Sequence, residues 1–245
     1  MAWYAYCITE QQAWTGTARA RRPFPIEDLK GIHQFQAFAY PSGEFCVIVS
    51  EHDTQDLTQT SMREHAHVIG ECFRTTTVLP FRFGTVFDDD ESLRRSVRTN
   101  RKHFSDTVAR LRGKAEMHIK LRLRDGSLGM AMTDIDLPHS VGDEYLKQLR
   151  EKASRHRERQ TKARALSMQV HKLLNPLAEE VQCRRAQSGA MELDIAHLIE
   201  HKSLEKYQNR WSTAQQQFKN CELIMSGPWP PYHFMAATKL VRKDN

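Results

Sequence analysis

Few residues of this chain of 245 residues have the types and spacing that catalysis requires. Ser203 and Lys206 match the S-x-x-K spacing, which can place a lysine beside a nucleophilic serine, but the companion motifs S-D-N and K-T-G are absent from the sequence. Ser203 also stands where a helix is expected to begin, and serine is a common helix cap. Glycine-rich phosphate loops and the H-E-x-x-H and G-x-S-x-G motifs are absent as well. We therefore expect no enzymatic activity and assign no catalytic residue.

Two groups of residues carry side chains that could bind a metal ion. His65 and Cys72 are seven residues apart and can share a helical face, and the run from Asp88 to Glu91 carries the carboxylate oxygens that Mg²⁺ prefers. A metal site needs three or four converging ligands, and acidic residues at a helix start are expected from the helix dipole alone. We expect a hydrogen-bonded helix histidine, a capped helix, and neither metal nor cofactor.

Large apolar side chains alternate along the stretch 78–87, which predicts a strand with one buried face. RNA-recognition sheets use aromatic residues two apart, flanked by basic residues, as stacking platforms. The stretch departs from that pattern at Thr85, where an aromatic residue is needed, so we favour core packing. For Arg82, two roles stay open: contact with a partner, or anchoring of a helix start or a carbonyl group. The apolar positions are Leu79, Phe81, Phe83 and Phe87.

The order of strand and helix patterns indicates an α+β fold of two domains. We expect small, mostly antiparallel sheets covered by helices, as variants of the ferredoxin-like arrangement, with a long charged helix starting the second domain. The predicted boundaries are 1–126 for the first domain, 127–141 for a connection and 142–245 for the second. Strands are predicted at 3–8, 32–40, 45–50, 78–87, 117–124, 191–195 and 223–225, and helices from 61, over 88–113, 143–174 and 176–185, and over 204–218.

Composition narrows the possible environments of the protein. Hydrophobic residues make up 40% and charged residues 27%, and no apolar run reaches the roughly 18 residues of a membrane span. The opening residues lack the basic and apolar segments of a secretory signal, so we expect a cytoplasmic protein. The five cysteines are scattered and contain no C-x-x-C pair, which predicts reduced thiols in the core.

The formal charge of +6 is concentrated in one segment. Residues 145–166 contain eight basic residues and two acidic ones, so the net charge of this segment of the predicted helix equals the whole excess. A solvated helix beside the domains and an electrostatic dock for an acidic assembly partner both fit this pattern. Arg155, Arg157 and Arg159 are the candidate partner contacts in it.

The residues near the C-terminus form a proline-rich strap, Pro228–Tyr232. Its P-x-x-P spacing matches polyproline ligands, whereas a rigid strap would pack Trp229 and Tyr232 onto the domain. These two aromatic residues are further candidates for partner contact.

Two segments of the sequence resemble the gas vesicle protein F/L (GvpF/GvpL) family. They are Thr77-Val78-Leu79-Pro80-Phe81-Arg82-Phe83-Gly84-Thr85-Val86-Phe87, followed by the helix that ends at Leu111-Arg112-Gly113, and the closing Ser226-Gly227-Pro228-Trp229-Pro230-Pro231-Tyr232-His233-Phe234. The opening Trp3-Tyr4-Ala5-Tyr6, then Val47-Ile48-Val49-Ser50 and Arg63-Glu64-His65-Ala66, extend the resemblance over nearly the whole chain.

The resemblance implies an accessory protein without enzymatic activity that helps to build gas vesicles. It implies binding to the hydrophobic shell protein, protection of that protein from aggregation, contacts with other accessory proteins, and retention as a minor vesicle component. Because the excess positive charge is a local stripe on one predicted helix and not a general coat, we expect no nucleic acid partner. The alternatives are an RNA-binding protein, or a general scaffold of the same fold in a cell without gas vesicles.

Overall fold

The computed structural model describes residues 2–15, 22–52, 56–123, 142–174, 178–184, 193–218 and 221–235. The chain has an α+β fold, and the strand pairs whose registers are known are antiparallel. It divides into two compact units, Met1–Glu116 with Pro228–Asn245, and Met117–Gly227. None of the helices within the described ranges is long and apolar enough to cross a membrane.

The first unit contains a sheet in the order β2-β3-β4-β1-β5, with β6 also paired to β1. Strand β1 is buried almost throughout because it pairs with β4 on one side and with β5 and β6 on the other. The strands are β1 (Trp3–Glu10), β2 (Phe24–Lys30), β3 (Gln36–Ser42), β4 (Phe45–Glu51), β5 (Val78–Pro80) and β6 (Val86–Phe87). Its helices are α1 (Gln12–Thr15), η1 (Ile32–Gln34), α2 (Gln59–Thr75), α3 (Asp90–Thr99), α4 (Arg101–Leu111) and η4 (Tyr232–Phe234).

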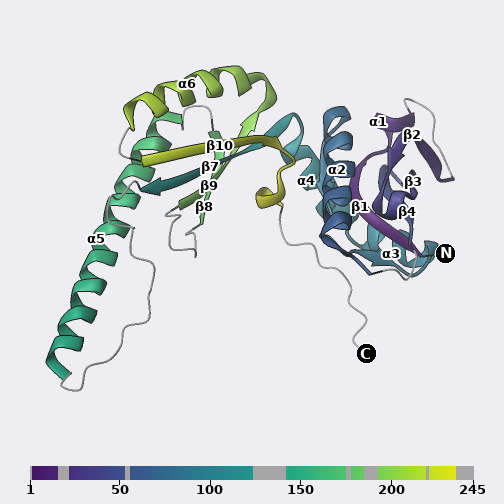
Figure 1. Ribbon diagram of the computed structural model, residues 1–245. Helices are drawn as coiled ribbons and strands as arrows, with labels where there is room; N and C mark the ends of the chain where they lie inside the picture. The colour runs from purple at the N-terminus through teal and green to yellow at the C-terminus, as the bar shows by residue number, and fades with distance from the viewer. Residues whose placement is uncertain are drawn as a thin grey trace. The chain divides into compact units, whose positions relative to one another are not determined.

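Helices cover both faces of the first sheet. The core between α2 and the sheet includes Tyr4 and Tyr6 of β1 and Ile69 of α2. On the other face, Phe104 of α4 packs edge-on against Phe45 of β4, with ring centroids 6.0 Å apart. Figure 1 shows α2 lying along β1. The side chains of β1 therefore alternate between two cores, one on each face of the sheet.

The second unit contains a sheet in the order β10-β7-β9-β8. Its core joins β7, β9 and β10 to the last turns of α5 and to α6, which lies across the sheet in Figure 1. The strands are β7 (Lys114–Leu123), β8 (Ala178–Arg184), β9 (Leu193–Glu200) and β10 (Cys221–Trp229), and the helices are α5 (Gly142–Leu174), η3 (His201–Ser203) and α6 (Leu204–Gln217).

The division into units differs from the predicted domain boundaries at two places. Most of β7 belongs to the second unit, although it was assigned to the first domain, because it pairs between β10 and β9. The residues after Gly227 return to the first unit. The predicted connection 127–141 lies outside the described residues, and the ferredoxin-like arrangement stays a prediction.

Several element predictions were wrong. The single helix expected over 88–113 is two helices, α3 and α4, which meet at Asn100. The stretch 78–87 forms β5 and β6 separated by a turn, in which Thr85 N donates to the Arg82 carbonyl at 3.1 Å and Gly84 has φ +84°, a value that glycine readily adopts. Strand β2 was not predicted, because the polar stretch rich in Gly, Pro and Arg that runs from Thr15 to Pro25 suggests a loop, whereas an edge strand tolerates proline. The helix expected over 176–185 is strand β8, since pairing with β9 overrides its helical propensity.

Candidate functional site

The strongest candidate site is a group of three side chains, Glu116 and His118 on β7 and His233 on η4. Successive side chains of a strand point to opposite faces, and Met117 and Ile119 fill the core. Glu116 and His118 therefore share the other face of β7, two residues apart. Glu116 is fully buried, which is rare for a carboxylate and requires partners for its charge.

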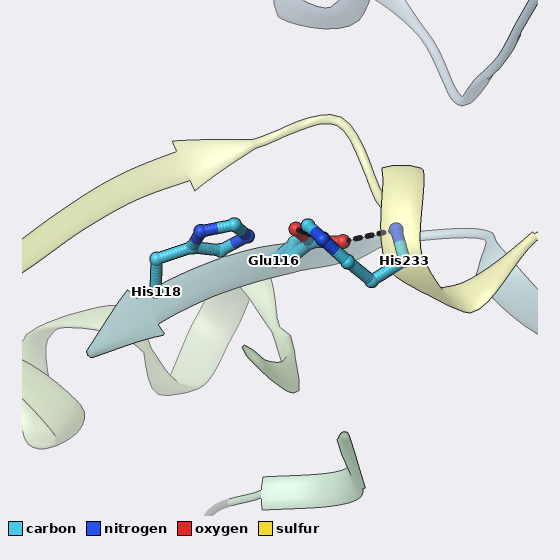
Figure 2. A group of neighbouring side chains, drawn as sticks. All are labelled: Glu116, His118 and His233. Atoms are coloured by element: carbon cyan, nitrogen blue, oxygen red, sulfur yellow. Dashed lines mark hydrogen bonds and ion pairs between the residues drawn. The ribbon is translucent and has the colours of Figure 1, made fainter. Parts of the chain in front are cut away.

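His233 supplies two such partners, one from its backbone and one from its ring. Its backbone N–H donates to Glu116 Oε2 at 2.8 Å, and its ring atom Nδ1 lies 2.6 Å from Glu116 Oε1. Figure 2 shows the His118 ring on one side of the Glu116 carboxylate and the backbone nitrogen of His233 on the other, with the His233 ring overlapping the carboxylate in this view. One ligand atom from each of the three residues lies within 4.8 Å of the other two.

A second carboxylate stands behind His118. Asp194 Oδ1, on β9, lies 3.9 Å from His118 Nδ1. This oxygen atom is buried, and it has no hydrogen-bond partner among the described residues. A carboxylate facing Nδ1 would orient the ring so that Nε2 faces Glu116, and Figure 2 shows a ring nitrogen of His118 turned toward that carboxylate.

The C-terminal strap packs onto the first unit through other residues than those predicted. Pro230, Pro231 and Phe234 are buried, and Arg110 of α4 donates to the Phe234 carbonyl. Trp229 is 48% exposed and Tyr232 is 41% exposed. The strap is therefore held by its prolines and Phe234, and the prediction that Trp229 and Tyr232 pack onto the domain is wrong, because both side chains are substantially exposed.

Tyr232 is partly exposed, and its phenol group is partly shielded from water. Desolvation raises the pKa of Tyr232 to about 12, and the buried Glu116 adds to the rise. The phenol therefore stays neutral over the physiological range. As a neutral amphipathic side chain, Tyr232 suits contact with an apolar partner surface.

The basic helix α5 is exposed over much of its length. The side chains of Leu149, Arg157 and Ala165 are all exposed, whereas Val170 and Leu174 in the last turns pack into the core of the second unit. Of the three candidate arginines only the side chain of Arg157 is described; Arg155 and Arg159 lie in the same helix. Exposed positions on several faces leave this part of α5 accessible to a partner.

A polar cleft of about 680 Å³ lies between the tip of the β3–β4 hairpin and helices α3 and α4. Arg94, Arg98 and Arg101 line it. Arg101 forms an ion pair with Glu44 at 2.9 Å, and Arg94 donates to the Tyr40 hydroxyl at 2.9 Å. Two of the three guanidinium groups thus interact with side chains in or next to the cleft.

The other residues considered from the sequence have structural roles. His65 Nδ1 lies 3.0 Å from the Tyr4 hydroxyl, and burial lowers the pKa of His65 to about 4. Asp89 caps α3 in a reciprocal arrangement with Ser92, as expected for the acidic run. Ser203 precedes α6 as predicted, but its side chain makes no capping hydrogen bond. Helix α2 begins earlier than predicted, with Thr58 as its cap.

The stretch around Arg82 contains buried aromatic residues and an exposed cation. Phe81 and Phe87 are each 8% exposed, and Phe83 packs against the core below α2. These rings do not form a stacking platform. Arg82 itself is exposed on the turn, which leaves it accessible to a partner.

Sequence reasoning missed the group of Glu116, His118 and His233. Glu116 and His233 are 117 positions apart, so no local spacing connects them. The available signal was the position of Glu116 beside the apolar alternation of β7, but the other face of that strand carries Lys120 and Arg122 and indicates a solvated surface. The closing P-P-Y-H-F run gave no indication of where its histidine would dock.

The chain is similar to gas vesicle proteins by three comparisons. The family model described as gas vesicle synthesis protein GvpL/GvpF matches residues 2–236. Gas vesicle protein L of Streptomyces sp. (strain CB03234) is 26% identical over 208 residues, which cover 80% of this chain and 77% of that protein.

Two solved structures share the fold. The crystal structure of GvpF from Anabaena sp. PCC7120 has a TM-score of 0.72 at 19% identity and covers 96% of both chains. GvpF from Microcystis aeruginosa has the same TM-score and identity, over 96% of this chain and 99% of that one. At this identity the likeness concerns the fold alone.

Proposed function

Because the chain belongs to the gas vesicle GvpL/GvpF family, we propose that it is an accessory protein of gas vesicle assembly. In this role it binds the hydrophobic shell protein, keeps it from aggregating before assembly, and stays in the vesicle as a minor component. The observation that carries the proposal is the family match, which spans residues 2–236. We propose no catalytic role.

Physical chemistry explains why such an accessory is needed. A shell subunit that presents an apolar face to gas exposes that face to water before it assembles. Large exposed apolar patches and unpaired strand edges promote aggregation. A partner that covers these surfaces reversibly would keep the subunit competent for assembly, and it needs exposed surfaces more than a deep pocket.

Two surfaces of this chain suit two parts of the proposed role: contact with the apolar shell protein and contact with other accessory proteins. Trp229 and Tyr232 offer exposed aromatic area beside buried prolines, which hold the strap rigid and reduce the entropy lost on binding. The exposed arginines of α5, including Arg157, would attract an acidic partner among the other accessory proteins. Arg82 is a further accessible cation in the first unit.

Co-expression with the shell protein tests this proposal. We expect the two proteins to purify together, and we expect the double variant Trp229→Ser and Tyr232→Ser to retain less than a fifth of the shell protein. The matched control is Met62→Ser, which removes an apolar side chain that is 53% exposed on α2. Full retention by the double variant would exclude the strap as the contact surface.

Two further observations separate the alternatives. A shell-protein gene beside the gene for this chain would support gas vesicle assembly over a general scaffold. RNA binding would weaken steeply with added salt as counterions are released, whereas capture of an apolar shell surface would persist.

A further inference from the structure

We propose that Glu116, His118 and His233 bind a divalent transition-metal ion such as Zn²⁺, and that the ion fastens the C-terminal strap to β7. This inference concerns ligand binding and does not depend on the proposed function. It revises the expectation from sequence that the chain binds no metal.

The three residue types match the chemistry of such an ion. Two imidazoles and one carboxylate are a common ligand set for Zn²⁺ and for Fe²⁺ and its neighbours in the first transition row. The candidate ligand atoms lie within 4.8 Å of one another, so modest side-chain rotations bring them to one centre. A carboxylate has about four lone-pair positions, so Glu116 can accept from His233 and also ligate an ion.

The local backbone holds the ligands in place. Glu116 and His118 are two residues apart on one strand, so the pleat of β7 sets their spacing. His233 is attached to Glu116 through its backbone N–H as well as its ring. The burial of Glu116 also limits competition from water for the ion.

Asp194 gives an independent indication. Metal-binding histidines usually donate their second ring N–H to a carboxylate or carbonyl group, which fixes the ring and raises its basicity. The buried Asp194 Oδ1, 3.9 Å from His118 Nδ1, stands in the position for that role and has no hydrogen-bond partner among the described residues. If this distance shortens when the metal binds, His118 Nδ1 can donate a hydrogen bond to Asp194 Oδ1.

Binding would stabilise the docked strap. His233 and Glu116 are 117 positions apart, so an ion held by both residues closes a long loop of chain. An ion that binds only the folded state raises its stability with the ion concentration. The melting temperature of the metal-free protein should therefore rise when Zn²⁺ is added.

The test uses the full chain, freed of metal with a chelator and dialysed. Equilibrium dialysis against ZnCl₂ with elemental analysis should give one tightly bound ion per chain, and Co²⁺ should show the d–d absorption of low coordination number. The decisive variant is His118→Gln, because it leaves both contacts between Glu116 and His233 intact. We expect it, and His233→Gln, to weaken Zn²⁺ binding at least tenfold, and Asp194→Asn to weaken it by about tenfold.

Two control variants separate this site from other histidines. His67→Gln removes an exposed histidine of α2, and His171→Gln removes one member of the His171–His197 pair, whose ring nitrogens are 3.5 Å apart. Both controls should bind Zn²⁺ like the unaltered chain. Failure of the unaltered chain to bind an equivalent of Zn²⁺, or equal binding by His118→Gln and the controls, would overturn the proposal.

Discussion

The imidazole and backbone N–H of His233 both contact the buried carboxylate of Glu116, at 2.6 and 2.8 Å, and so fix the C-terminal strap to strand β7. The same strap carries the exposed Trp229 and Tyr232. The Glu116–His233 contact therefore positions the surface that we propose for partner binding. Loss of this contact should affect both stability and binding.

Replacement of Glu116 by alanine should lower the free energy of unfolding of the first unit by about 3 kcal/mol. The change leaves the N–H group of His233 without its acceptor and removes the anchor of the strap. Urea denaturation followed by tryptophan fluorescence measures the effect. The control is Glu222→Ala, whose partner Arg122 is 3.4 Å away in an exposed pair that should contribute less than about 1 kcal/mol. Equal losses for both variants would refute this account of the strap.

Gly31→Ala should be one of the most damaging small substitutions in the first unit. A Cβ atom at Gly31 would lie 1.9 Å from the Tyr6 hydroxyl oxygen. That hydroxyl group accepts from Ile32 N at 2.7 Å and contacts Ser50 Oγ at 2.8 Å, so it cannot move without breaking buried hydrogen bonds. We expect a loss of about 2 to 4 kcal/mol, measured by chemical denaturation.

Gly70→Ala is the matched control for this substitution. A Cβ atom at Gly70 meets nothing within 4 Å, and the residue lies in α2. Because alanine favours the helix over glycine, this variant should gain about 0.5 to 1 kcal/mol. A loss at Gly70 as large as the loss at Gly31 would contradict the steric explanation.

Stability should fall as the pH drops from about 6.5 to about 4. Burial lowers the pKa of His65 and of His197 from 6.5 to about 4, with the neighbouring His171 adding to the effect at His197. Between pH 6.5 and pH 4 these two histidines are protonated in the unfolded chain but stay neutral in the folded chain. Their contribution to the free energy of unfolding is therefore fully present above pH 6.5 and is lost as the pH falls toward 4. Each histidine should account for roughly 3 kcal/mol across that window.

Histidine variants identify the source of the pH dependence. In His65→Gln, unfolding of the first unit should depend less on pH between 6.5 and 4, whereas the exposed His67→Gln should keep the full dependence. Denaturation curves at several pH values provide the comparison. An unchanged slope in His65→Gln would assign the effect to other groups.

Much of the fold follows from local patterns in the sequence. The alternation of Met117, Ile119 and Leu121 predicts β7, and the spacing of Tyr207, Trp211 and Ala214 predicts α6, because a single buried face sets each pattern. The four cysteines whose side chains are described are buried thiols that form no disulfide bond with one another, as expected from their scattered positions. Where the burial of a single face decides whether a segment forms a helix or a strand, the local residue pattern is sufficient to predict that element.

The failures occur where distant pairing decides the structure. Strand β8 exists because β9 is beside it, and β2 exists because β3 offers an edge. The docking of His233 on Glu116 is a contact of the same kind, across 117 positions. Neither helical propensity nor motif spacing contains information about such pairs, so the candidate metal site was not predictable from the sequence.

Charge reversal on α5 should weaken contacts with acidic accessory proteins. The triple variant Arg155→Glu, Arg157→Glu and Arg159→Glu replaces an attractive surface with a repulsive one, so we expect at least tenfold weaker binding at low salt and little difference at high salt. Calorimetric titration at two salt concentrations measures this. Unchanged affinity at low salt would leave α5 as a solvated helix without a docking role.

The most direct test of the central claim is a sedimentation assay with the shell protein. Shell protein diluted from denaturant should pellet alone and should stay in the supernatant with an equimolar amount of this chain. Serum albumin at the same concentration serves as the control. Retention of most of the shell protein in a complex with this chain is the predicted result. Pelleting to the same extent as with albumin would contradict the role in keeping the shell protein available for assembly.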